Sequence, residues 1–151
     1  MKRKPAAAVE IVIEIANHQD CLRLDLRRLR TAVRRALRAA RVAKARISVA
    51  VVDDATIARL NWRYLRHPGP TDVLSFLLDS RAGLEGEVIV SAEAALRSAP
   101  HFGLPPRDEL ILYAVHGTLH LAGYDDRTPQ QSEEMRKRET EVLKSMEISP
   151  R

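Results

Sequence analysis

Residues 105–126 read PPRDELILYAVHGTLHLAGYDD and predict a helix that leads into an acidic turn. Two prolines stand where the first turn of a helix tolerates them, and Asp108 and Glu109 would lie favourably at its N-terminal dipole. A long apolar run follows, which is typical of a central, buried helix. Gly123 can adopt the left-handed backbone that ends a helix, so we expect the chain to turn back there.

The end of this segment carries a candidate metal site. His116 and His120 are four residues apart, which on a helix places both imidazoles on one face. Zn²⁺ binds imidazole nitrogen, and a catalytic zinc site usually has three protein ligands and one open position. The acidic pair Asp125-Asp126 follows the turn and offers the third ligand. The alternative is two half-buried histidines with hydrogen-bonded rings beside an ordinary polar turn.

Length and composition indicate one globular domain, which we expect to span residues 1–151. Apolar residues make up 45% of the chain and charged residues 30%, as in ordinary soluble proteins. Cys21 is the only cysteine, which excludes an intrachain disulfide and favours a reducing compartment. Glu10 and Glu14 interrupt the apolar stretch 6–16, which is too polar for a signal peptide or a membrane span. We therefore expect a cytoplasmic protein.

Positive charge is concentrated in the first half of the chain. The net charge is +5, but residues 1–66 carry 16 Lys and Arg against 6 Asp and Glu. Residues 67–151 carry 9 Lys and Arg against 14 Asp and Glu. The first half of the chain is basic, and the second half is acidic and carries the metal site. This division suggests that the basic half binds a polyanion and presents it to the metal site. Nucleic acid is the first candidate for that polyanion.

Hydrophobic periodicity in the rest of the chain predicts an α+β fold. The expected elements, in chain order, are a strand over 9–15, a helix over 25–41, a strand over 47–51, a helix that Asp53 or Asp54 caps, strands over 73–78 and 87–90, a helix over 91–100 that Ser91 caps, the helix from 105, and a helix from 128. The two middle strands are close enough to form a hairpin. We expect a small mixed sheet of about four strands packed with about five helices.

The helix over 25–41 has an apolar stripe and seven arginines. Because no acidic residue occurs between Asp25 and Asp53, these arginines repel one another unless an anion is present. An ordinary solvated helix face is the alternative. We favour contacts with a phosphate backbone, made by Arg27, Arg28, Arg34, Arg35, Arg38 and Arg41. Trp62 and Tyr64 could both belong to the core, so a surface for base stacking is poorly supported.

Two blocks of sequence resemble the YbeY family of bacterial rRNA-maturation endoribonucleases. Residues 116–126 match its signature H-G-x-L-H-L-x-G-Y-D-H at every specified position except the last. Residues 60–76 match the block L-N-x-x-Y-R-x-x-D-x-x-T-D-V-L-S-F except at Leu65 and Pro68. Residues 86–91 are similar to the family's G-D-I-x-I-S strand. Two blocks at consistent spacing make coincidence an unsatisfactory explanation.

The resemblance implies a metal-dependent endoribonuclease that cuts single-stranded rRNA in rRNA maturation and ribosome quality control, with the small ribosomal subunit as partner. It also implies that His116, His120 and Asp126 hold one metal ion, with Asp126 in place of the family's third histidine. Zn²⁺ accepts a carboxylate ligand, although the harder oxygen also leaves Mn²⁺ or Fe²⁺ open. The family's site arginine falls on Leu65, so Arg66 becomes a weak candidate for the catalytic arginine.

Other functions remain open at this point. A ribosome-associated rRNA-binding assembly factor with weak or no nuclease activity would need only the basic face. Hydrolysis of a small phosphoester or amide could use the same site. However, zinc peptidases of the H-E-x-x-H type need a glutamate as general base where this chain has Gly117. An Fe(II) oxygenase shares the two-histidine, one-carboxylate set, and nothing else in the chain supports it.

Overall fold

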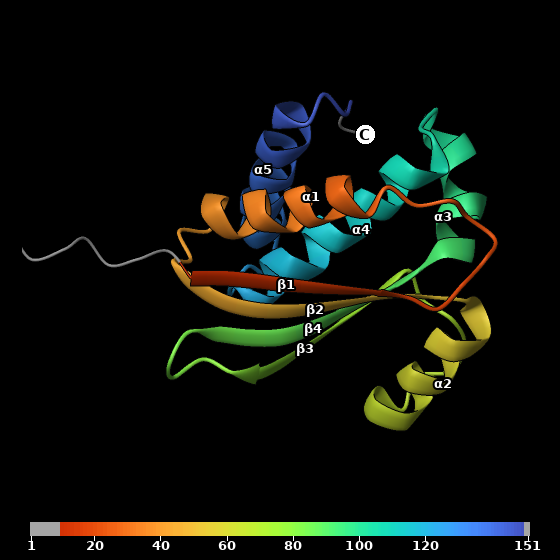
Figure 1. Ribbon diagram of the computed structural model, residues 1–151, viewed down its shortest axis with the longest axis horizontal. Helices are drawn as coiled ribbons and strands as arrows, with labels where there is room; N and C mark the ends of the chain where they lie inside the picture. The colour runs from red at the N-terminus through yellow and green to blue at the C-terminus, as the bar shows by residue number, and fades with distance from the viewer. Residues whose placement is uncertain (1–9, 150–151) are drawn as a thin grey trace, which may run out of the picture.

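The structure is a computed structural model that describes residues 10–149, in which helices pack on a mixed four-stranded sheet (Figure 1). The strands are β1 (Glu10–Asn17), β2 (Lys44–Val52), β3 (Val73–Asp79) and β4 (Leu84–Ser91). The helices are α1 (Leu26–Ala39), α2 (Asp54–Leu65), α3 (Ala92–Ser98), α4 (Pro106–Leu121) and α5 (Pro129–Ser145), with a 3₁₀ turn, Ala99–Phe102, after α3. The predicted α+β class is therefore confirmed. Val9, the predicted start of the first strand, lies outside the described residues.

The strands lie in the order β1-β2-β4-β3. β1 and β4 both run parallel to β2, whereas β3 pairs antiparallel with β4, as the predicted hairpin requires. The alternating pattern of the strands sends one set of side chains, such as Ile13, Ile47 and Val88, into the core beneath the helices. Figure 1 shows α1, α4 and α5 above the sheet and α2 alone below it.

The predicted central helix is α4. Eleven of its sixteen residues are buried, because the helix is apolar on nearly all sides and lies between the sheet and α1, α3 and α5. Gly117 allows its close approach to the sheet. A Cβ atom there would lie 2.8 Å from Val88 Cγ1, 2.9 Å from Ser75 Oγ and 2.9 Å from Val73 Cγ2. The sheet thus leaves no room for a side chain at Gly117, the position that carries the glutamate in zinc peptidases of the H-E-x-x-H type.

Polar side chains begin several helices where the sequence places them. Asp53 caps α2 and Ser91 caps α3, each accepting a hydrogen bond from a backbone N–H of the first turn. Thr128 and Gln131 form a capping box at α5, with Pro129 as the first helical residue. Among residues 10–149, no helix has the length and apolar character needed to cross a membrane.

The two aromatic side chains of α2, whose burial the sequence left open, lie in solvent. Tyr64 lies on the same side of the helical pattern as Ile57, yet Tyr64 is 57% exposed, and only Ile57 and Asn61 are buried in this helix. Trp62, which could have belonged to the core, is 53% exposed. The reason is that α2 covers only one end of the second face of the sheet. A helix with a single neighbouring layer buries a narrow stripe and leaves its other sides in solvent.

Candidate metal centre

The last turn of α4 brings two imidazoles together. His120 Nε2 lies 3.0 Å from His116 Nε2, and the two rings stand at 85° to each other. Both side chains are about 30% exposed, so they form part of the surface while their backbone is packed in the core. The i, i+4 spacing produces this arrangement because residues four apart lie on one face of a helix.

A glycine turn then returns the chain to these rings. The Gly123 N–H donates to the carbonyl of His120 and the Tyr124 N–H to that of Leu119, a pair of bonds that ends many helices. Gly123 has a φ of 102°, which L side chains rarely adopt. Beyond the turn, Asp126 Oδ2 lies 3.7 Å from His120 Nε2 and 3.9 Å from His116 Nε2.

These three atoms form a set that could hold a metal ion. A tetrahedral ion with bonds of about 2.0–2.1 Å places its ligand atoms roughly 3.4 Å apart. The observed separations of 3.0, 3.7 and 3.9 Å bracket that value. Small rotations of the side chains would close the geometry. Two imidazole nitrogens and one carboxylate oxygen also occur together in catalytic zinc sites, which leave a position open.

The other nitrogen of each ring is already hydrogen-bonded. His120 Nδ1 lies 3.0 Å from the carbonyl oxygen of Tyr124, and His116 Nδ1 lies 2.5 Å from Glu139 Oε1. Both partners are acceptors, so a ring that donates from Nδ1 would have its Nε2 atom available to an ion, and the two Nε2 atoms lie within hydrogen-bonding distance of each other. Metal-ligating histidines are usually held in this way by a carboxylate or a carbonyl.

Glu139 is a functional residue that the sequence analysis missed. It belongs to α5 and lies in the inward stripe that also contains Met135, Val142 and Met146. An acidic residue within an apolar stripe is the signal that identifies it. Burial opposes a charge on His116, but the hydrogen bond and negative charge of Glu139, with the charges of Asp126 and Asp72, raise the pKa of His116.

The two acidic residues of the turn have different surroundings. Asp125 accepts a hydrogen bond of 2.8 Å from the Asp126 N–H and pairs with Arg127 Nε at 3.2 Å, so it shapes the turn. Asp126 instead presents its side chain to the histidines, and Ser132 of α5 donates to its backbone carbonyl. Arg138 of α5 donates to the Tyr124 hydroxyl. α5 therefore holds the turn at two points.

Two cavities meet at His116. One, of about 660 Å³, is lined by both histidines together with Leu65, Leu77 and Arg127. The other, of about 470 Å³, is lined by Glu139, Arg136 and Phe102 among others. Leu65, at the family's arginine position, thus faces the same cavity as His116 and His120, whereas Asp126 lines the second cavity. Arg127 and Arg136 are the arginines that line these cavities, and the sequence analysis named neither.

Arg66, the arginine that the sequence analysis named as a catalytic candidate, lies outside the cavity of the two histidines. It ends α2 in a left-handed conformation, and its guanidinium group lies 5.7 Å from the centre of the Trp62 ring. It is not among the residues that line the cavity of the two histidines. Its catalytic role remains a prediction.

The arginines of α1 are of two kinds. Arg28 pairs with Asp108 at 3.5 Å and donates to the Met146 carbonyl, and Arg35 donates to the backbone carbonyl and hydroxyl of Ser145. These two side chains therefore tie α1 to its neighbours, which reduces their availability to an anion. No ion pair within residues 10–149 engages the other four predicted RNA-binding residues, which are Arg27, Arg34, Arg38 and Arg41.

A model of the family described as Endoribonuclease YbeY matches residues 14–147. The chain belongs to this family. Membership confirms the resemblance that the blocks at residues 60–76 and 116–126 predict. Leu65, which lines the cavity of the two histidines, and Asp126, which lines the neighbouring cavity, are two of the three positions at which the chain departs from the two YbeY blocks.

Relatives named Endoribonuclease YbeY agree with this assignment. The protein of Rhodopirellula baltica is 43% identical over 105 residues, which cover 68% of this chain and 54% of the relative, so the match spans about half of that relative. The proteins of Syntrophus aciditrophicus and Thermobifida fusca are 33% and 37% identical, over 89% and 87% of this chain and 89% and 91% of their own lengths. A solution structure from Thermotoga maritima shares the fold, with a TM-score of 0.61 at 24% identity over 90% of this chain and 92% of that one.

Proposed function

We propose that this chain, an endoribonuclease by its family, cuts single-stranded rRNA with one metal ion held by His116, His120 and Asp126. The observation that carries the proposal is the meeting of three potential ligand atoms, His116 Nε2, His120 Nε2 and Asp126 Oδ2, within 3.0–3.9 Å. Both Nδ1 atoms have acceptors, which leaves the two Nε2 atoms, 3.0 Å apart, beside Asp126 Oδ2.

The donor set favours Zn²⁺, with Mn²⁺ or Fe²⁺ as the alternatives that a carboxylate ligand allows. When bound, the ion supplies Lewis acidity at a phosphate oxygen and lowers the pKa of a coordinated water. Zn²⁺ with one carboxylate ligand keeps a net positive charge, which suits a phosphodiester substrate.

The chain's own residues would orient the two histidine rings and bind the phosphates of the RNA. Glu139 and the Tyr124 carbonyl hold the two rings in the required tautomer. Arg127 lines the cavity of both histidines and would neutralise charge that develops on the scissile phosphate. Leu65 supplies only apolar surface where the family has its arginine. The exposed arginines of α1 would hold more distant phosphates without reading their sequence.

The same proposal includes the biological setting. The chain would work as a single domain in the cytoplasm, on rRNA of the small ribosomal subunit, in maturation and quality control. The basic first half of the chain supports a polyanionic partner of this size.

His120→Ala is the first test, measured by metal content and by cleavage of a single-stranded rRNA fragment. We expect both to be lost. His101→Ala is the matched control, because His101 is exposed on the 3₁₀ turn outside the site. An His120→Ala protein that cuts RNA at the wild-type rate would exclude this mechanism.

A second candidate is an rRNA-binding assembly factor with weak or no nuclease activity. The observation in its favour is Leu65, an apolar side chain in the cavity where the family has a cation. RNA binding that persists in EDTA, together with no metal-dependent cleavage by the purified wild-type protein, would favour this candidate.

A further inference from the structure

We propose that the last turn of α2 is a binding surface for single-stranded RNA beside the candidate metal centre. The surface consists of Trp62, Arg63, Tyr64 and Arg66. Bases would stack on the two rings, and the guanidinium groups would contact phosphates. The proposal rests on the proposed function, because the bound RNA is a segment of the strand that the metal centre cuts.

The two rings are exposed to an unusual degree. Trp62 and Tyr64 are 53% and 57% exposed, although the chain has only six aromatic residues of the Trp, Tyr and Phe types. Large aromatic side chains are usually buried for most of their area, and exposed apolar surface at one place often marks an interaction site. Two of the six thus lie in solvent in the last turn of α2, on different sides of the helix, because residues two apart on a helix do not face each other.

Each ring has a cation beside it. The guanidinium carbon of Arg63 lies 5.5 Å from the centre of the Tyr64 ring, and that of Arg66 lies 5.7 Å from the centre of the Trp62 ring. Neither arginine has an ion pair with any carboxylate in the described part of the chain. A ring for a base and a free cation for the adjacent phosphate are the two parts that single-strand binding requires.

Leu65 lies between this surface and the cavity of the two histidines, and none of the four surface residues lines that cavity. Leu65, between Tyr64 and Arg66 in sequence, lines the cavity that also contains His116 and His120. A strand that lies in this cavity and leaves it past Leu65 therefore reaches the α2 surface at once. The apolar residue at the family's arginine position would contact a base or ribose on this route.

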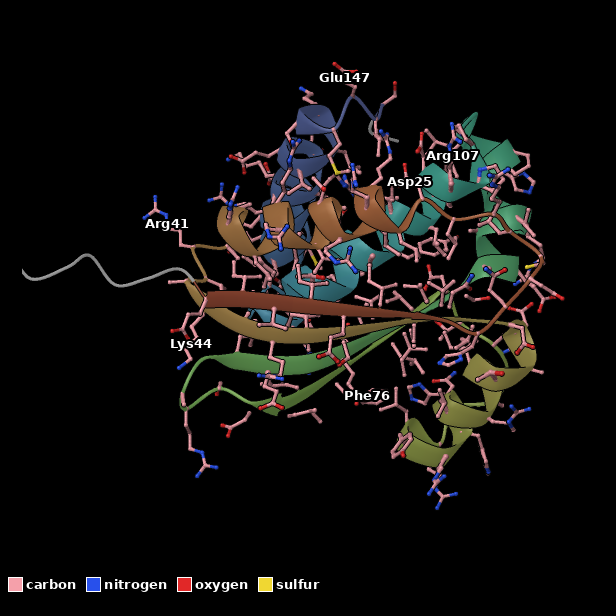
Figure 2. The ribbon with its side chains drawn as sticks, viewed as in Figure 1. Asp25, Arg41, Lys44, Phe76, Arg107 and Glu147 are labelled. Atoms are coloured by element: carbon pink, nitrogen blue, oxygen red, sulfur yellow. The ribbon has the colours of Figure 1, made fainter. Side chains whose placement is uncertain are left out.

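Charge on the open face of the sheet favours the same route. On the face opposite the core, β1, β2 and β4 carry four exposed glutamates against Lys44 and Arg46, so this face has a net negative charge; the glutamates are Glu10, Glu14, Glu85 and Glu87. These carboxylates would repel RNA. Phe76 is paired with Glu87 in register and contacts the Tyr64 ring at 5.4 Å, so it marks the border between the acidic face and α2 (Figure 2).

RNA binding at this surface can be followed by tryptophan fluorescence, because Trp62 is the only tryptophan in the chain. The full chain would be titrated with a 12-nucleotide oligouridylate in EDTA, which prevents metal-dependent cleavage, and then with zinc supplied. We expect saturable quenching of the Trp62 fluorescence in both conditions, because a stacked base changes the surroundings of the indole.

Three variants would then be compared by the fluorescence anisotropy of a labelled oligouridylate. Trp62→Ala should weaken binding by about 5- to 100-fold, the usual effect of losing one stacked base, and Trp62→Phe should restore most of it. The Arg63→Gln/Arg66→Gln protein should lose about 1.4 from the slope of log affinity against log salt, since each phosphate contact on a single strand contributes about 0.7. The matched control is Arg81→Gln/Arg107→Gln, which removes the same charge at the β3–β4 turn, where Arg81 lies, and at the N-terminus of α4, where Figure 2 shows Arg107.

The outcomes separate this inference from the proposed function. Wild-type protein that cuts rRNA without Trp62 quenching, or a Trp62→Ala protein that binds as tightly as wild type, overturns the inference alone. Quenching by intact small subunits but not by free RNA also overturns it and assigns the surface to a ribosomal protein. Wild-type protein that neither binds nor cuts RNA with zinc present overturns both.

Discussion

The Nδ1 atom of His116 lies 2.5 Å from Oε1 of Glu139, which connects the candidate metal site to the last helix. The two residues are 23 positions apart, on α4 and α5. The carboxylate can accept the Nδ1–H, which fixes the orientation of the imidazole and would leave Nε2 to an ion. Glu139 would therefore act on a bound metal through His116, as a positioning residue.

Removing the Glu139 carboxylate should weaken metal binding without unfolding the protein. We expect the zinc affinity of Glu139→Ala to fall by about 10- to 100-fold, with Glu139→Gln between this variant and wild type, because an amide oxygen still accepts a hydrogen bond but carries no charge. Competition with a chromogenic chelator would measure the affinity. The pKa of His116 in the metal-free protein, followed by NMR, should also fall, since Glu139 raises it. Glu141→Gln is the control, because Glu141 pairs only with Arg138. Equal zinc affinities for Glu139→Ala and Glu141→Gln would contradict this role.

Asp126 and Asp125 should differ in their effect on the metal. Asp126→Ala should lose zinc at stoichiometric concentrations, and Asp126→His should regain it, since an imidazole at this position completes a three-histidine site. Asp125→Asn should keep zinc, because Asp125 pairs with Arg127 and with the backbone of the turn. Metal analysis after gel filtration would show whether Asp125 or Asp126 holds the ion. Loss of zinc from Asp125→Asn with retention in Asp126→Ala would reverse the assignment.

Gly117 should be intolerant of a methyl group. At an open position in a helix, alanine in place of glycine gains about 1 kcal/mol. Here the added Cβ would lie 2.8–2.9 Å from side-chain atoms of Val88, Ser75 and Val73. Overpacking of this kind costs about 1–3 kcal/mol, so the clash should outweigh the helix propensity and Gly117→Ala should be destabilised. Urea denaturation would measure the difference. A Gly117→Ala protein more stable than wild type would show that α4 can move from the sheet without cost.

Asp54 should contribute to stability only above acidic pH. Hydrogen bonds from Arg97, opposed by burial and assisted by Ser91, hold the pKa of Asp54 below its usual value. A carboxyl group whose pKa is lowered by folding adds stability above its unfolded pKa of about 3.9, and that stability is lost as the pH falls through the folded value. Wild type should therefore exceed Asp54→Asn in free energy of unfolding at pH 7, and the difference should shrink toward pH 3. A difference that stays constant across this range in urea titrations would contradict the account.

Periodicity predicted most of the fold because the strands and α4 bury their side chains in regular patterns. Ile13 and Ile47 alternate with exposed residues as strands with one covered face should, and α4 is apolar on nearly all sides. The exposure of Tyr64 could not be predicted, because helical spacing does not reveal how many layers cover a helix. Nothing local in the sequence distinguishes a helix within a layer from α2, which lies alone on the second face of the sheet.

The candidate ligands could be predicted because they lie close together in the sequence. His116, His120 and Asp126 are separated by one helical turn and one glycine turn, whose geometries are known in advance. Glu139, Leu65 and Arg127 acquire their places through tertiary packing. Glu139 reaches His116 only because α5 folds back along α4, and Leu65 reaches the cavity only because α2 ends beside β3.

The most direct test of the central claim is zinc-edge X-ray absorption of the wild-type protein with one equivalent of zinc. We expect a first shell of two imidazole nitrogens at about 2.0–2.1 Å and a carboxylate oxygen at about 2.0–2.2 Å, with one remaining position filled by solvent. The two-imidazole scattering should disappear in His120→Ala. A spectrum without histidine scattering, or one unchanged in His120→Ala, would show that the ion binds elsewhere and would contradict the assignment of this site.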